Sequence, residues 1–124
     1  MEALDIQGTN DTPKVLLDPE NNIFEISGRS LPEDVVSFYR PVLDWLEDYK
    51  SGPLDYTEFV FRYVYFNTAT SKLVQEILIK LEELFEAGNN IQVLWFYEEE
   101  DEDMQDAGEE FMENTEVPFE LLGY

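Results

Sequence analysis

The chain has 124 residues, of which 44% are hydrophobic and 15% aromatic, and this is enough apolar material for one packed core in a single domain over residues 1–124. Its 29 acidic and 7 basic residues give a formal net charge of −22, which disfavours contact with nucleic acids and with anionic membrane surfaces. Because there is no Cys and no His, disulfides, thiol nucleophiles and most acid–base, triad and zinc mechanisms are excluded. The sequence shows neither a signal peptide nor an apolar segment of membrane-spanning length, so we expect a cytoplasmic protein.

The N-terminal part of the chain predicts a β-hairpin followed by a helix. Two short apolar runs, residues 14–17 and 23–27, are separated by a turn-rich segment, and this spacing is typical of a hairpin. Residues 30–33 fit a capping box, in which Ser30 caps a helix and an acidic residue follows three positions later. We therefore expect a helix that starts at Ser30 and ends near Gly52.

The centre of the chain predicts a long strand that leads directly into an amphipathic helix. Within residues 58–66 an aromatic side chain recurs at every second position from 59 to 65, and the residues between them are Val60, Arg62 and Val64. This enrichment in aromatic and β-branched residues at period two indicates a strand with one buried face. The side chains expected on that face are Phe59, Phe61, Tyr63 and Tyr65. Apolar residues then recur at helical spacing until Gly88, which predicts a helix from Ala69 to Glu86. The hydroxyl-rich segment 67–72 is thereby placed at the start of this helix.

The C-terminal part predicts a second buried strand over residues 91–97 and then a run of six consecutive carboxylates over residues 98–103. Because like charges this dense resist packing, we expect the run to be a solvated loop that leads to a short helix over residues 104–113. Residues 117–122 are expected to form an edge strand. The alternation of strands and helices predicts an α/β sandwich, with a mixed β-sheet packed by about three to four helices.

Thr68 is the candidate regulatory residue, because a hydroxyl at a helix start is a favourable place for a phosphate. The unpaired backbone N–H groups and the positive end of the helix dipole stabilise negative charge there, and Lys72 lies one turn away. The simpler explanation is structural, since Thr and Asn are good helix caps whose loss costs ~1 kcal/mol. From the local sequence alone this structural explanation is favoured. It applies equally to Thr70 and Ser71, which can simply begin the first turn.

Two other classes of function stay open at this point. A small enzyme or metal-binding domain could use the many carboxylates with Mg²⁺ or Ca²⁺, although residues 98–103 and those that follow lack the ligand spacing of an EF-hand loop. An acidic decoy could instead cover the basic, nucleic-acid-binding surface of another protein by charge alone. The sequence has no Gly-rich phosphate loop and no kinase catalytic loop, so we expect a kinase substrate and not a kinase.

A set of short motifs, spread over nearly the whole chain, resembles one known family. These motifs are Gly8-Thr9, Thr12-Pro13, Gly28-Arg29-Ser30-Leu31-Pro32-Glu33, Phe38-Tyr39-Arg40-Pro41, Trp45-Leu46, Tyr65-Phe66-Asn67-Thr68, Ser71-Lys72, Trp95-Phe96-Tyr97 and Pro118-Phe119. In this combination they resemble the SiaC-type regulatory phosphoproteins, a family of small bacterial proteins. The family is similar in architecture to the STAS-like anti-sigma-factor antagonists, which implies a STAS-like α/β sandwich with a phosphorylatable residue at a helix start.

The resemblance also implies a function. In this family a dedicated Ser/Thr kinase phosphorylates the threonine that corresponds to Thr68, a PP2C-type phosphatase removes the phosphate, and the unmodified protein binds and activates a diguanylate cyclase. The chain is thus expected to be a non-enzymatic partner-switching module without a cofactor or metal. Its expected partner-binding residues are Asn67, Thr68, Thr70, Ser71 and Lys72. The chain has Ala69-Thr70 where relatives carry serines, a departure that leaves Thr68 intact.

Overall fold

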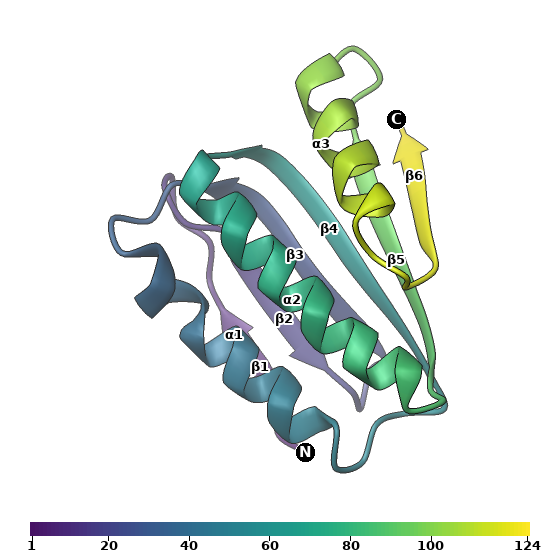
Figure 1. The fold of residues 1–124 in the computed structure, drawn as a ribbon. Helices are drawn as coiled ribbons and strands as arrows, with labels where there is room; N and C mark the ends of the chain where they lie inside the picture. The colour runs from purple at the N-terminus through teal and green to yellow at the C-terminus, as the bar shows by residue number, and fades with distance from the viewer.

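In the computed structural model, which describes all residues from 1 to 124, three helices cover one face of a six-stranded mixed sheet (Figure 1). The strand order in the sheet is β1-β2-β3-β4-β5-β6; the first three strands are antiparallel neighbours, and β3 to β6 run parallel. The elements are β1 (Leu4–Ile6), β2 (Lys14–Asp18), β3 (Ile23–Ser30), α1 (Val35–Tyr49), β4 (Tyr56–Phe66), α2 (Thr68–Glu86), β5 (Asn90–Tyr97), α3 (Glu102–Glu113) and β6 (Phe119–Gly123).

The position of the helices follows from the order of the strands. Each step from β3 to β6 joins neighbouring parallel strands through one helix, and crossovers of one hand that advance in one direction lie on the same face of a sheet. Helices α1 and α2 lie side by side over the centre of the sheet, whereas α3 lies against β5 and β6 (Figure 1). The predicted mixed α/β fold is therefore confirmed, with three helices in one layer.

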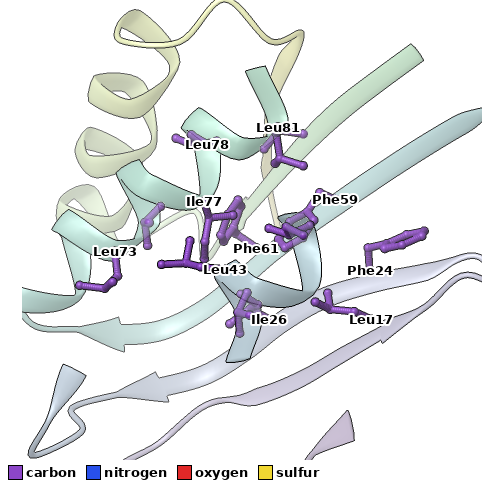
Figure 2. Close-up of a cluster of buried hydrophobic side chains, with 14 of the residues drawn as sticks. Leu17, Phe24, Ile26, Leu43, Phe59, Phe61, Leu73, Ile77, Leu78 and Leu81 are labelled. Carbon is purple, nitrogen blue, oxygen red and sulfur yellow. The ribbon is translucent and has the colours of Figure 1, made fainter. Parts of the chain in front are cut away.

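The core lies between this layer of helices and the inner face of the sheet. It contains 25 buried hydrophobic residues, among them Phe59 and Phe61 of β4, which are fully buried as expected. Leu73, Ile77, Leu78 and Leu81 of α2 pack over these strand residues (Figure 2). The predicted hairpin is confirmed as β2 and β3, and the predicted edge strand as β6. The short strand β1 was not predicted, because three residues are too few to show a period.

A β-bulge at the end of β4 changes which side chains face the core. Gly28 pairs with Tyr63 but Arg29 pairs with Tyr65, so β4 has one extra residue, Val64, at this point. Gly28 has φ +102°, a conformation that suits glycine and few other residues. The prediction that Tyr65 lies on the buried face was wrong: Val64 and Tyr65 are 59% and 49% exposed. The bulge thus turns Tyr65 toward solvent just before α2 begins.

The predicted capping box at Ser30 was also wrong. Ser30 is the buried last residue of β3, and α1 begins only at Val35. The N-cap is Asp34, whose Oδ1 accepts a hydrogen bond from the Ser37 amide at 3.1 Å. This contact lowers the pKa of the Asp34 carboxyl. The sheet overrode the local motif because Ser30 pairs with Phe66 in the ladder of β3 and β4.

Helix α3 starts two residues earlier than predicted, inside the acidic run. Asp101 is its N-cap and accepts a hydrogen bond from the Met104 amide at 3.0 Å. Glu102 and Asp103 therefore lie in the first helical turn, where the helix dipole stabilises negative charge. Only residues 98–100 remain as the exposed loop that was expected for the whole run. None of the three helices combines the length and the apolar character that a bilayer crossing requires.

Candidate functional site

The candidate site is the junction between β4 and α2, where Asn67 and not Thr68 caps the helix. The Asn67 side-chain Oδ1 accepts a hydrogen bond from the Thr70 amide at 2.9 Å, and its backbone carbonyl accepts one from the Ser71 amide at 3.3 Å. Thr68 is the first helical residue and its side chain is exposed. Helix capping therefore does not account for the Thr68 hydroxyl, and the simpler structural explanation falls away for this residue.

Beneath this junction lies a chain of buried hydroxyl groups that joins α2, β3, α1 and β4. The Ser30 Oγ lies 2.9 Å from the Thr70 Oγ1 and 2.7 Å from the Tyr39 hydroxyl, which in turn lies 2.9 Å from the Tyr63 hydroxyl. The Thr70 hydroxyl also donates to the Ser30 carbonyl at 3.2 Å. These contacts hold the start of α2 on the ends of the two central strands.

The two tyrosines among these linked hydroxyl groups are neutral at pH 7, and burial extends their neutral range to higher pH. Desolvation raises the pKa of Tyr39, and it raises the pKa of Tyr63 well above the ordinary tyrosine value. The nearby Tyr39 adds to the shift at Tyr63. The linked hydroxyl groups of Thr70, Ser30, Tyr39 and Tyr63 therefore contribute hydrogen bonds and no charge beneath the site at neutral pH.

A groove of about 690 Å³ lies beside Thr68, between the first half of α2 and the length of α3. Its apolar lining consists of Tyr65, Phe66, Met104, Ala107 and Phe111. The bulge at the end of β4 places Tyr65 and Phe66 there. The polar and charged lining consists of Asn67, Thr68, Ser71, Lys72 and Gln75 on one side and of Asp101, Asp103, Glu110 and Asn114 on the other. The site is thus an open, partly apolar groove with Thr68 in its wall.

The structure brings together four of the five residues that the sequence indicated for partner binding. Asn67, Thr68, Ser71 and Lys72 all line the groove. Thr70 does not, because its side chain is fully buried beneath the helix start. A partner cannot touch the Thr70 hydroxyl in this conformation, and this residue contributes by holding α2 in place.

Sequence reasoning missed the opposite wall of the groove, which α3 supplies. The contributing residues are Asp101, Asp103, Met104, Ala107, Glu110, Phe111 and Asn114. Their spacing of three and four residues is a helical signal that was available in the sequence. What the sequence could not show is that α3 lies across the groove from the start of α2, a segment that comes much earlier in the chain.

The carboxylates do not gather where the acidic run first suggested a metal. Glu82, Glu86 and Glu116 place carboxylate oxygens within 4.8 Å of one another, and none of them belongs to residues 98–103. All three side chains are at least partly exposed, and a solvated acidic surface accounts for them. These carboxylates therefore give the metal-binding hypothesis no support.

Taken together, the mixed α/β fold, the exposed hydroxyl at the start of α2 and the groove beside it are features of a regulatory domain that binds another protein. The model of the family described as "SiaC family regulatory phosphoprotein" matches residues 6–124, and the chain belongs to this family. The resemblance seen in the sequence is thereby confirmed. The similarity to STAS-like antagonists stays a prediction.

Proteins of Pseudomonas aeruginosa resemble the chain over its full length. A protein of Pseudomonas aeruginosa (strain UCBPP-PA14) is 31% identical over 124 residues, which are 100% of this chain and 98% of the relative. The crystal structure of apo-SiaC from Pseudomonas aeruginosa has a TM-score of 0.90 at 30% identity, covering 98% of this chain and 99% of that one. SiaC in a crystal structure with the diguanylate cyclase SiaD, which it activates, has a TM-score of 0.91 at 30% identity and the same coverage.

Proposed function

We propose that this protein is a non-enzymatic partner switch in the cytoplasm, controlled by one phosphate on Thr68. A protein Ser/Thr kinase adds the phosphate and a PP2C-type phosphatase removes it. The unphosphorylated form binds an effector, a diguanylate cyclase, and the phosphorylated form does not. The structure of a similar SiaC with the cyclase SiaD supports this choice of effector.

The observation that carries the proposal is the position of Thr68 in the first turn of α2, where its side chain is exposed. Asn67 caps the helix, so the Thr68 hydroxyl is not needed for that role. The amides of Thr68 and Ala69 come before the first helical hydrogen bond, so they are available to an anion. Lys72 is exposed four residues later on the same helix, within reach of a charge on Thr68. A phosphate at this position would therefore be tolerated by the fold.

Because the fold tolerates the phosphate, its effect falls on the partner. A phosphothreonine carries about −1.5 to −2 charges, and covering such a group with a protein surface costs its hydration unless cations replace the lost water. Thr68 lines the groove together with Asn67, Ser71 and Lys72, which we propose as contact residues for the effector. The effector that binds the neutral threonine would be released when the charge appears.

The test compares binding of the purified protein to the diguanylate cyclase of the same organism. We expect Thr68→Asp to weaken binding about tenfold or more, because the carboxylate reproduces part of the phosphate charge at the interface. Thr68→Ala should bind as the wild type does. Ala69→Asp is the matched control, since it adds the same charge at the neighbouring exposed position. Wild-type affinity for Thr68→Asp, or an equal loss for Ala69→Asp, would count against the proposal.

A further inference from the structure

The groove beside Thr68 follows the whole length of α3. The α3 residues that line it, Asp103, Met104, Ala107, Glu110 and Phe111, occur at spacings that place them on one face of the helix. A helix of twelve residues is about 18 Å long. The facing wall is the first two turns of α2. Between the two walls lies the apolar floor of the groove, to which Tyr65 and Phe66 contribute. A rod-shaped partner would therefore lie between the two helices with its apolar side on this floor.

The two walls of this groove carry opposite charge. On α3, six of the twelve residues are acidic and none is basic, and Asp103 and Glu110 line the groove. On α2, the charged residue in the lining is Lys72, which forms none of the ion pairs of the structure. A partner that fits must therefore present positive charge along the edge that faces α3.

We propose that the groove receives an amphipathic α-helix of the effector protein, with an apolar stripe on the floor and Lys or Arg residues along the edge that faces α3. The inference rests on the proposed function, because Thr68 lies in the α2 wall of the same groove. Helix-in-groove binding needs an apolar floor and anchors at helical spacing, and both are present here. A second copy of this chain is a poor occupant, because each copy carries a net charge of −22.

This arrangement gives the phosphate a specific place to act. A phosphate on Thr68 would stand in the α2 wall and neutralise Lys72 one turn away, on the side of the bound helix opposite its basic edge. Binding would then cover the phosphate without a cation of the partner to replace its lost water. The phosphate would also occupy part of the groove mouth. Release of the effector helix then requires no rearrangement of the core.

The first test maps the occupant by photo-crosslinking in cells of the source organism. A benzophenone amino acid replaces Gln75, a partly exposed residue of the groove lining, in the full chain carrying Thr68→Ala. The control position is Val36, which is 50% exposed and lines a different groove, between α1 and α2. Mass spectrometry of the cross-linked peptides then identifies the partner segment.

We expect Gln75 to capture an amphipathic helix with Lys or Arg along one edge, and Val36 not to capture that segment. A cross-link to a second copy of the chain, to a segment without a basic edge, or to nothing at Gln75 would overturn the proposal. Repeating the Gln75 experiment with Thr68→Asp separates the two hypotheses. Capture of the same basic helix in that background would support the groove and contradict the phosphate switch.

The second test reverses single charges and measures affinity for the captured protein. Glu110→Lys changes a residue of the groove lining, whereas Glu109→Lys makes the same charge change at an exposed neighbour that does not line the groove. We expect Glu110→Lys to weaken binding about tenfold and Glu109→Lys to change it less than about twofold. Equal losses in both variants would show a general charge effect and overturn the groove as the docking site.

Discussion

The substitution Thr70→Val tests whether the buried hydroxyl chain holds the start of α2 in place. Valine keeps the shape of the side chain but removes the hydroxyl, which contacts the Ser30 Oγ at 2.9 Å and the Ser30 carbonyl at 3.2 Å. Both Ser30 atoms keep another partner, since the Oγ contacts Tyr39 and the carbonyl accepts from the Asn67 amide at 3.2 Å. No buried group is left unpaired, so the cost is that of the two lost bonds.

At about 1 kcal/mol per hydrogen bond, the free energy of unfolding should fall by about 2 kcal/mol in Thr70→Val. Urea titration followed by the fluorescence of the two buried tryptophans, Trp45 and Trp95, measures this change. The matched control is Ser71→Ala, which removes a bond from the Ser71 Oγ to the Thr68 carbonyl at a half-exposed position where water can replace it. A loss below about 0.5 kcal/mol in Thr70→Val, or an equal loss in both variants, would refute the reasoning.

Two further predictions concern packing and pH. In Gly108→Ala the new Cβ would lie 2.5 Å from the Trp95 Cδ1, so overpacking of about 1–3 kcal/mol should exceed the gain of about 1 kcal/mol in helix propensity. Thermal melting should show a lower midpoint for this variant but not for Gly52→Ala, whose Cβ meets nothing within 4 Å. Above about pH 10, where the unfolded chain releases tyrosine protons that the folded chain retains, the free energy of unfolding should fall with pH. Between pH 9 and 11, Tyr63→Phe should lose less of its free energy of unfolding than the wild type does. The limiting slope is ~1.4 kcal/mol per pH unit for each tyrosine. An identical pH profile for the variant and the wild type would contradict a raised pKa of Tyr63.

Period and composition were enough to predict most of the fold. The hairpin, the strands β4 and β5 and the helix α2 were expected from the spacing of apolar residues, because burial of one face dictates that spacing. The errors occurred where contacts distant in sequence decide. Ser30 has a good capping motif but is taken into the sheet by β4, and the bulge opposite Gly28 reverses the alternation before Tyr65.

Only the part of the candidate site that is formed by neighbours in sequence was predicted. Thr68 and its neighbours form a local feature, so the sequence indicated them directly. The burial of Thr70 depends on Ser30, 40 residues earlier, and the groove depends on α3, which belongs to a different part of the chain. Neither contact leaves a signal in a single sequence, because side-chain periods describe each element and not which elements meet.

The central claim is that one phosphate on Thr68 decides whether the effector binds. The most direct measurement is a binding titration of the diguanylate cyclase of the same organism with two preparations of the protein, one unmodified and one phosphorylated on Thr68 as verified by peptide mass spectrometry. We expect the unmodified protein to bind and the phosphorylated protein to bind at least about tenfold more weakly. Equal affinity of the two forms would contradict the claim.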